Sequence, residues 1–324
     1  MRPAALALIL AALVTAALTG VAFGAVTLSL ADVGHALLGT ADGPARAIVR
    51  SVRLPRVVLG ALVGAGLGMS GAALQGTLRN PLAEPYLLGV SGGAAVGAVF
   101  AVVVGGAHGL LVPIAAFVGA LVAVAVVLIV ARAAGAQGDA RLLLMAGVIV
   151  GAFANAAIMV ALANAPANTV RGATWWMMGS LADADWGQVR WLATLLAIGG
   201  GALLWLAREI DVLALGAEAA AALGVEPDAA SRRVFVAASL VAAATVAAAG
   251  LVGFVGLVVP HLARSAGARG QRAAVWSSAL VGAALVIAAD VTARVVLRPT
   301  ELPLGAVTAL IGVPFFLVRL RRLA

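Results

Sequence analysis

The chain has 324 residues, of which 64% are hydrophobic and only 10% are charged. Charged residues make up about a quarter of an average soluble domain, so this composition excludes an ordinary soluble globular protein. The formal net charge of +8 comes from 21 basic residues, all arginine, against 13 acidic ones. Without cysteine there is no disulfide or cysteine-ligated metal, and without lysine there is no ordinary P-loop ATPase, because that phosphate loop needs a lysine.

Apolar runs of about 20 residues, long enough for a helix to cross ~30 Å of hydrocarbon, recur along the chain. We therefore predict an all-α polytopic membrane protein of about ten transmembrane helices that forms a single domain over residues 1–324. The expected spans are 4–29, 56–76, 86–106, 110–133, 141–163, 188–207, 234–252, 254–264, 273–297 and 303–320. The eighth is too short to cross alone. The first is interpreted as a span rather than a signal peptide, because it exceeds a typical apolar signal core and no clean small-residue cleavage site follows.

The second span is rich in glycine at helical spacing. Gly60, Gly64 and Gly68 recur every four residues, which predicts close approach of another helix where lipid provides no hydrophobic drive. The stretch GLGMSG at 66–71 also fits the spacing of a dinucleotide fingerprint. Because it lies inside an apolar span and follows no strand, we interpret it as a packing surface.

The distribution of arginine predicts the orientation of the chain. With the N-terminus inside, 13 of the 21 arginines fall in cytoplasmic segments, so both termini are expected in the cytoplasm. The cluster of Arg46, Arg50, Arg53 and Arg56 then lies outside, against the usual bias. Two explanations stay open for it: contact with lipid headgroups, or pairing with carboxylates of a docking protein.

The end of the ninth span reaches the same outer face with Arg294 and Arg298. Asp290 and Arg294 are four residues apart on the expected helix, so we predict that they pair.

Two interruptions break the apolar pattern on the cytoplasmic side. In the first, Asn80, Pro81 and Pro85 cannot continue a helix, and irregular backbone at membrane depth is tolerated where it is buried in protein or lines an aqueous cavity. A plain turn in which Asn80 caps the next segment is the alternative. The second, residues 208–233, is interpreted as two short helices, one over 217–223 that ends at Gly224 and one that begins at Pro227. On these residues alone, it is equally a solvated loop.

The histidines and tryptophans give weaker signals. His35, His108 and His261 are scattered without ligand spacing, so no metal site and no cofactor are expected. Tryptophans gather on the predicted outer side, where an interfacial aromatic belt is the simplest interpretation and contact with a large substrate ring, helped by nearby methionines, is the alternative. These residues are Trp175, Trp176, Trp186 and Trp191, with Met177 and Met178.

An ordered set of motifs resembles the FecCD family of permeases, the membrane subunits of binding-protein-dependent ABC importers for iron(III)-siderophores, haem and vitamin B12. The motifs are RLPR at 53–56, RNPLAEPYLLGVSGGAAVG at 79–97, WWMMGSL at 175–181, ALGAEAAAALGV at 214–225, GLVGFVGLVVPHLAR at 250–264 and ELPLGAVTALIGVPFF at 301–316. The resemblance covers nearly the whole chain. It implies a homodimer in the bacterial inner membrane, a separate ATPase, a soluble substrate-binding protein, and no catalytic site or nucleic acid.

The resemblance also implies roles for particular residues. Binding-protein docking falls on Arg53, Arg56 and Arg294, which would pair with glutamates of the partner, while lipid stays the expected contact of Arg46, Arg50 and Arg298. The cytoplasmic constriction of the translocation path falls on Asn80, Pro81 and Leu82, faced by Gly138, Asp139 and Ala140. ATPase coupling falls on Gly216, Glu218, Ala222, Leu223, Gly224 and Val225 in the loop at about 208–233.

Two other functional classes fit the sequence less well. A secondary transporter typically has paired ionisable residues at mid-membrane and inverted repeats, but only Asp290 lies well inside a span and no repeat is visible. An intramembrane enzyme needs a nucleophile with a base, or a metal cluster, and neither is found. For the cargo, an iron chelate is the commoner assignment in the resembled family. WMMG at 176–179 resembles some corrinoid permeases, whereas the acid at Asp139 departs from others.

Overall fold

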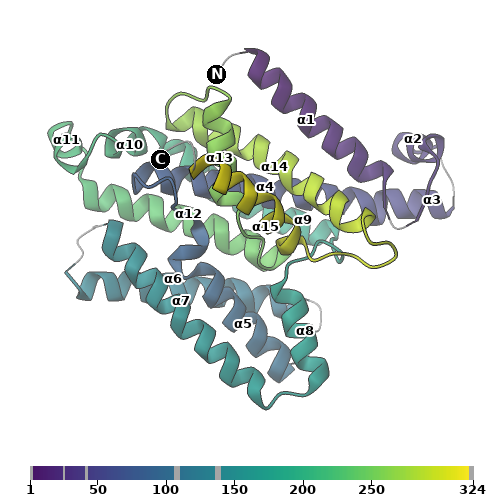
Figure 1. The fold of residues 1–324 in the computed structure, drawn as a ribbon, viewed down its shortest axis with the longest axis horizontal. Coiled ribbons are helices and arrows are strands. Elements are labelled where there is room, and N and C mark those ends of the chain that lie inside the picture. The colour runs from purple at the N-terminus through teal and green to yellow at the C-terminus, as the bar shows by residue number, and fades with distance from the viewer. Residues whose placement is uncertain (1–2, 25, 41–42, 106–109, 136–139, 321–324) are drawn as a thin grey trace.

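A computed structural model describes residues 3–24, 26–40, 43–105, 110–135 and 140–320, and within these ranges the regular elements are all helical (Figure 1). The longer helices are α1 (Pro3–Ala22), α4 (Leu54–Thr77), α5 (Val90–Gly105), α6 (Leu111–Ala133), α7 (Ala140–Ala163), α9 (Trp186–Trp205), α12 (Pro227–Ala249), α14 (Gln271–Val295) and α15 (Leu304–Leu320). The shorter ones are α2 (Leu30–Leu38), α3 (Pro44–Ala47), the π-helix η1 (Ile48–Arg53), the 3-10 helix η2 (Pro85–Leu88), α8 (Ala167–Met177), α10 (Ala207–Leu213), α11 (Ala217–Ala222) and α13 (Val255–Ser265). The predicted all-α class is confirmed.

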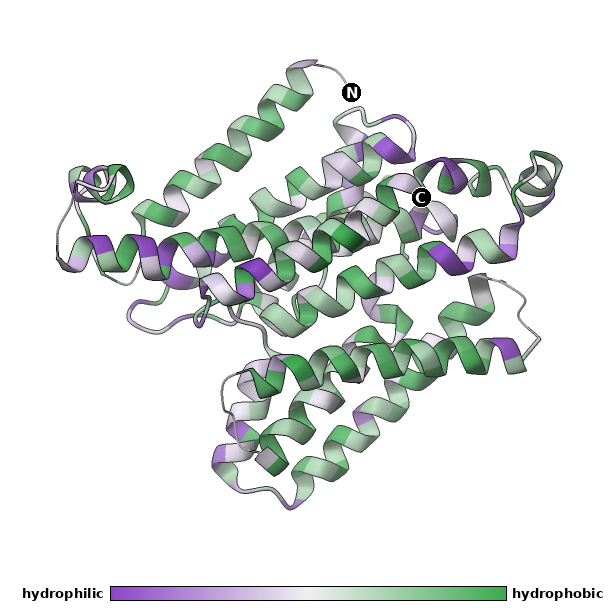
Figure 2. Cartoon of the chain, turned by 180° about the vertical axis from the view of Figure 1, so that it is seen from behind, coloured by the Kyte–Doolittle hydropathy of each residue, from purple (hydrophilic) through white to green (hydrophobic). Residues whose placement is uncertain are grey.

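Each of the ten predicted spans contains one main helix, although the third, 86–106, also takes in η2, which Gly89 at φ 78° separates from α5. By length and composition, 7 helical segments are apolar and long enough to cross a membrane, and α5 and α15 are shorter apolar helices. The eighth predicted span is α13, which at 11 residues is indeed too short to cross alone. Hydrophilic residues lie mostly near helix ends and in connections, as Figure 2 shows.

The two largest differences from the predicted boundaries have local reasons. The first span was predicted to reach residue 29, but α1 ends at Ala22. There the side chain of Arg53 donates hydrogen bonds to the last carbonyls of the helix. The seventh was predicted to start at 234, but α12 starts at Pro227. The Glu226 carboxylate accepts the N–H groups of Asp228 and Ala229, and proline suits the first helical position, so the helix begins in polar sequence that hydropathy leaves out.

Helix α4 lies at the centre of the larger group of helices, where it contacts α14, α12, α13 and α9, while α1 packs on α14. Helices α5, α6 and α7 pack together as a second group, which joins the first through α12 (Figure 1). We call the end of the molecule where α4 begins the outer end, and the end where α4 finishes beside α10 the inner end. The labels describe only position along α4.

The predicted close approach along α4 is confirmed at Gly64 and Gly68, whereas a β-carbon at Gly60 would meet side chains, the nearest being Leu181 at 3.1 Å. A β-carbon at Gly64 would lie 2.0 Å from the carbonyl oxygen of Gly282 in α14, and one at Gly282 would lie 2.1 Å from the carbonyl oxygen of Gly64. A β-carbon at Gly68 would lie 2.3 Å from the Ser278 oxygen. The GLGMSG stretch is therefore helical packing surface, and α4 and α14 touch backbone to backbone.

We expect Gly64→Ala to destabilise the protein by about 1–3 kcal/mol, because the added methyl overlaps main chain that cannot rotate away. The matched control is Gly201→Ala in α9, where a β-carbon would have nothing within 4 Å. Alanine there should be neutral or slightly stabilising, since it is the better helix former. Thermal unfolding of the purified variants in detergent measures the difference, and equal melting temperatures would contradict the packing argument.

Candidate functional site

The outer end holds a buried ionic network centred on Arg56. Its guanidinium contacts Asp290 Oδ1 through Nε at 3.0 Å and Nη2 at 2.9 Å. The same guanidinium makes a two-point contact with Glu301, from Nη1 to Oε1 at 2.9 Å and from Nη2 to Oε2 at 2.8 Å. Asp290 also pairs with Arg294 at 3.0 Å, which confirms the predicted pair four residues apart. Two carboxylates and two guanidiniums thus compensate one another.

Arg53, and the N–H groups of Arg294 that do not pair with Asp290, donate to carbonyls at the end of α1. Arg53 Nη1 donates to the carbonyls of Val21 at 2.8 Å and Ala22 at 2.7 Å, and Nη2 donates to the carbonyl of Val26. Arg294 donates to the carbonyls of Gly20 and Phe23, both at 3.2 Å. Cations near the last carbonyls of a helix satisfy unpaired acceptors and oppose the helix dipole favourably.

The three predicted docking arginines therefore lie together, but they face inward. Arg53, Arg56 and Arg294 are only 3%, 6% and 3% exposed. The side chain of Glu301 is 29% exposed and is the member of the network nearest to solvent. A docking partner would meet Glu301 before it met the arginines.

The remaining outer arginines differ in their contacts. Arg50 donates to the carbonyls of Ala36 at 2.9 Å and Leu37 at 3.2 Å at the end of α2, so it has protein partners in place of the expected lipid. Arg46 and Arg298 are exposed.

At the inner end of α4, the predicted break forms a turn. Asn80 Oδ1 accepts the N–H of Leu82 at 2.9 Å, and both Pro81 and Leu82 are exposed. The carbonyl of Pro81 lies 3.2 Å from His261 Nε2, and the His261 ring meets Phe316 edge-on, with 5.7 Å between ring centroids. The turn is thus placed beside α13 and α15. Gly138 and Asp139 lie outside the described residues, and Ala140 is the first residue of α7.

The carboxylate between the two prolines positions the start of α13. Glu84 Oε1 accepts the N–H of Phe254 at 2.8 Å, and the hydroxyl of Tyr86 accepts the N–H of Val252 at 2.8 Å. Phe254 has φ 66°, a left-handed conformation that non-glycine residues rarely adopt. Burial raises the pKa of the Glu84 carboxyl, and the Phe254 N–H opposes that shift only in part. We call this pair of contacts the Glu84–Tyr86 latch.

Phe254, which the latch holds, also lies against α15. A β-carbon at Gly312 would lie 2.6 Å from the Phe254 β-carbon, so α15 rests directly on the residue that Glu84 holds.

The inner segment from 207 to 225 consists of α10 and α11. The N–H of Val225 donates to the carbonyl of Ala220 at 2.9 Å and that of Gly224 to Ala221 at 3.0 Å, which is a Schellman ending with Gly224 at φ 78°. The predicted stop at Gly224 is confirmed. The predicted second helix begins at Pro227 as expected, but it is the long span α12 and not a short helix.

The predicted coupling residues divide into an exposed set and a packed set. Leu223 is 61% exposed, and Glu218, Ala222 and Gly224 are exposed too. Val225 instead packs against the small cluster around Leu213 and Ala220.

One hydrogen bond and one close approach place this segment against the helices above it. A β-carbon at Gly216 would lie 3.3 Å from the guanidinium of Arg79, and Asp211 accepts the N–H of Gln271 at 2.8 Å. The inner segment is therefore attached to the ends of α4 and α14.

The aromatic residues of the outer side do not behave as one belt. Trp175 is 52% exposed, and Trp186 donates its indole N–H to the carbonyl of Arg50 at 3.0 Å. Trp191 packs edge-on against Phe117, with 5.5 Å between ring centroids.

Sequence reasoning missed the roles of Glu84, Tyr86 and Glu301. A signal existed for two of them, since Glu84 is the one acid between two prolines and Tyr86 is the single tyrosine in the chain. Glu301 carried no local signal, because its partner Arg56 is 245 residues away.

The profile of the FecCD transport family matches residues 9–322. The chain is 45% identical over 277 residues to the cobalamin import system permease protein BtuC of Halobacterium salinarum, covering 86% of this chain and 74% of that protein. It is 34% identical over 322 residues to the Fe(3+)-citrate import system permease protein YfmE of Bacillus subtilis, covering 99% of this chain and 96% of that protein. A solved ABC transporter of the metal-chelate type in an inward-facing conformation superposes with a TM-score of 0.86 at 28% identity, covering 99% of this chain and 100% of that one.

We expect Glu84→Ala to destabilise the protein by about 1–3 kcal/mol, because it leaves the Phe254 N–H without its acceptor. Glu84→Gln keeps an acceptor oxygen and should be milder. The raised pKa also has a pH signature. A carboxyl that holds its proton more tightly when folded contributes stability below its ordinary value of 4.5, and that contribution is lost as the pH rises through the folded value.

The melting temperature of the unmodified protein should therefore fall relative to that of Glu84→Gln as the pH rises above 4.5. Melting curves of both proteins over a pH series measure this difference. A constant difference would contradict burial of a titrating carboxyl at this position.

Proposed function

Because the chain belongs to the FecCD transport family and is the membrane permease of an ABC importer, we propose that it moves a metal chelate into the cytoplasm. It is not an enzyme, since in this family the ATPase is a separate subunit. The proposed cargo is an iron(III)-siderophore, haem or a corrinoid. The observation that carries this proposal is the match over residues 9–322, together with relatives named for cobalamin and for Fe(3+)-citrate, both of which are metal chelates.

The proposed path runs past the turn at Asn80, Pro81 and Leu82. Leu82 is 47% exposed, so a path lined by this turn needs a second wall. We propose that a second copy of the chain supplies this wall, which gives a homodimer with the path along its axis. The arginine distribution supports a multi-pass inner-membrane protein with both termini, and hence the inner end, in the cytoplasm.

The three arginines proposed to dock the binding protein already have partners within the chain. Arg53 and Arg294 cap α1, and Arg56 is already bound by two carboxylates. We propose that an acidic group of the binding protein reaches Arg56 by displacing Glu301, the half-buried partner that lies nearest to solvent. Replacing these arginines with glutamate would also disturb the end of α1, so a loss of binding in such a variant could not be assigned to docking alone.

For coupling, we propose that α11 and the exposed residues around it seat in a cleft of the ATPase. Support comes from exposed Leu223 at the end of α11 and from the attachment of the segment to α4 and α14. The residues proposed to form the contact are Gly216, Glu218, Ala222, Leu223 and Gly224, with Val225 behind them.

The function is tested by reconstituting the chain in vesicles with its genomic neighbours, an ATPase and a binding protein. We expect ATP-dependent uptake of a labelled chelate, with corrinoid, ferric-siderophore and haem arms to identify the cargo. The chain alone should hydrolyse no ATP. Uptake driven by an ion gradient without the ATPase would overturn the proposal in favour of a secondary transporter.

The docking proposal predicts that Glu301→Gln strengthens association with the binding protein, because it removes the carboxylate that competes for Arg56. The gain should appear mainly in the association rate and should shrink at high salt. Asp183→Asn, which removes an exposed outer acid that is not part of the network, is the matched control and should have a smaller effect. Surface plasmon resonance in two salt concentrations measures both. Identical affinities of Glu301→Gln and the unmodified chain would remove Arg56 from the docking surface.

The coupling proposal predicts that Gly224→Leu blocks binding of the ATPase and uptake. A β-carbon at Gly224 would have nothing within 4 Å, so the isolated chain should lose only about 1 kcal/mol from the positive φ. Gly267→Leu is the matched control, since Gly267 has φ 89° and equally open surroundings in the neighbouring inner turn. Co-purification of the ATPase decides between them. If Gly267→Leu loses the ATPase and Gly224→Leu retains it, coupling lies in the turn from Arg264 to Arg272 instead.

A further inference from the structure

We propose that the inner end of α12 carries a binding site for an anionic phospholipid. The guanidiniums of Arg132 and Arg232 would hold the headgroup phosphate, and the apolar groove between α9 and α12 would hold an acyl chain. The assignment to the cytoplasmic leaflet rests on the proposed orientation, whereas the binding itself does not.

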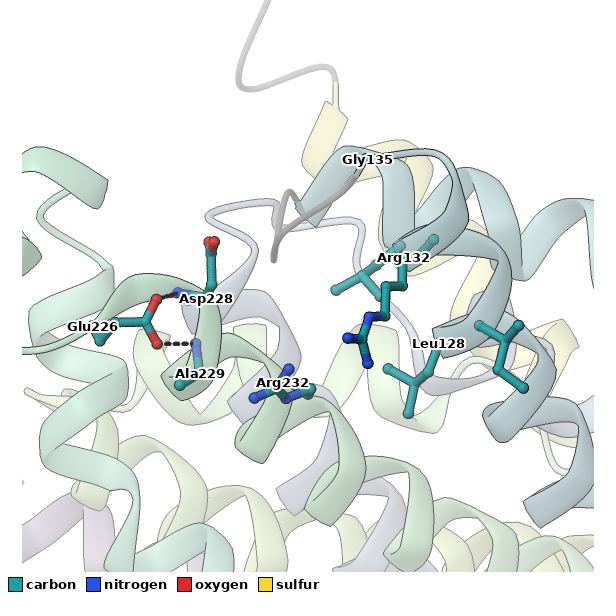
Figure 3. Close-up of a pocket in the computed structure, with 10 residues that line it drawn as sticks. Leu128, Arg132, Gly135, Glu226, Asp228, Ala229 and Arg232 are labelled. Atoms are coloured by element: carbon teal, nitrogen blue, oxygen red, sulfur yellow. Dashed lines mark hydrogen bonds between the residues drawn. The ribbon is translucent and has the colours of Figure 1, made fainter.

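The headgroup part is a cavity of about 580 Å³ between the inner ends of α6, α7 and α12. Figure 3 shows Arg132 from α6 and Arg232 from α12 reaching into the space between the helices, next to Leu128. Both arginines are exposed, and neither has a carboxylate within 4.0 Å in the part of the chain that the structure describes. Two guanidiniums facing one cavity suit a phosphate, which accepts several charge-assisted hydrogen bonds.

Glu226, one of the two acids that line this cavity, is occupied by the backbone. Both oxygens of Glu226 accept backbone N–H groups of the first turn of α12, from Asp228 at 3.2 Å and Ala229 at 2.7 Å (Figure 3). Asp228 also has an interaction of its own. Arg132 and Arg232 are the two cationic side chains that line the cavity.

The acyl part is a second cavity of about 440 Å³, on the other side of Arg232. Its walls are almost wholly apolar and come from the inner half of α9 and the facing side of α12. They comprise Ile198, Gly199, Ala202, Trp205, Leu206, Val236, Ala237 and Leu240, with Arg232 and Arg233 at one end. Because Arg233 pairs with Glu209 at 2.8 Å, Arg232 is the charge that joins this groove to the headgroup cavity.

The dimensions fit a lipid rather than a soluble anion. From Arg232 to Leu240 the groove follows two turns of α12, which is about 12 Å at 1.5 Å per residue. One leaflet of hydrocarbon is about 15 Å thick, so the groove covers most of the depth of an acyl chain. Trp205 at its inner end is 76% exposed, as expected for a tryptophan at the level of the headgroups. A soluble phosphate would have no use for this apolar extension.

The positive charges of Arg132 and Arg232 favour a lipid with an anionic headgroup. Basic side chains next to the cytoplasmic leaflet attract its negatively charged lipids, and each arginine adds to the binding free energy. A lipid bound here would bridge α6, α9 and α12 immediately after the proposed coupling segment. It would hold the first turns of α12 at a fixed distance from α6.

The test uses the purified chain in detergent, titrated with phosphatidylglycerol, phosphatidylcholine or inorganic phosphate while thermal unfolding is followed. We expect phosphatidylglycerol to raise the melting temperature and the other two to have little effect. The double variant Arg132→Gln/Arg232→Gln should bind phosphatidylglycerol on the order of tenfold more weakly. The matched control is Arg269→Gln/Arg272→Gln, which removes two exposed inner arginines that line neither cavity and should leave binding unchanged.

A second measurement locates the acyl chain. Phosphatidylglycerol with brominated chains, added to vesicles of unlabelled phosphatidylcholine, should quench tryptophan fluorescence, and Trp205→Phe should lose part of that quenching. Equal effects of phosphatidylglycerol and phosphatidylcholine would overturn the site, as would unchanged binding in the double arginine variant. If inorganic phosphate reproduces the whole effect, the cavity binds a soluble anion and the proposal fails. None of these results depends on cargo, ATPase or binding protein, so they are independent of the transport assay.

Discussion

The structure depends on the direct contact between the backbones of α4 and α14. Lipid is as apolar as a leucine side chain, so burying leucine between two helices in a membrane gains little hydrophobic free energy. The helices must therefore be held together by close van der Waals contact. Gly64 and Gly282 allow this contact by each leaving room for the carbonyl of the other. The two helices therefore act as one rod, on which α1, α9, α12 and α13 pack.

Both ends of this rod carry polar contacts to other parts of the chain. At the outer end, Arg56 from α4 and the pair Asp290–Arg294 from α14 join the two helices to each other and to the end of α1. At the inner end, the N–H of Gln271 donates to Asp211 in α10, and the guanidinium of Arg79 lies beside Gly216. In the proposed importer, the two partner proteins would thus contact opposite ends of one rigid element, which is a direct mechanical route between them. The Glu84–Tyr86 latch adds a second connection, from the turn after α4 to α13 and α15.

Much of this could be predicted from the sequence, and the limits have a physical cause. The spans follow from length and hydropathy, the Asp290–Arg294 pair from helical spacing, and the end of α11 from the φ that glycine permits at position 224. These are local properties. Contacts across the fold were missed: Glu301 finds Arg56 over 245 residues and Glu84 finds Phe254 over 170, and nothing near either carboxylate specifies the partner. Resemblance placed Arg53, Arg56 and Arg294 at one end together, but only the structure gives them internal acceptors.

The contact between Gly64 and Gly282 also limits how this protein can evolve. At most packing contacts, a larger residue on one side can be accommodated by a smaller one on the other, and homologous sequences record the exchange as correlated substitutions. Here both sides already have the smallest residue, so no second change can compensate for a first. This contact, among the tightest that the described residues make, should therefore leave no correlated signal in a family alignment, and methods that infer proximity from such correlations would overlook it.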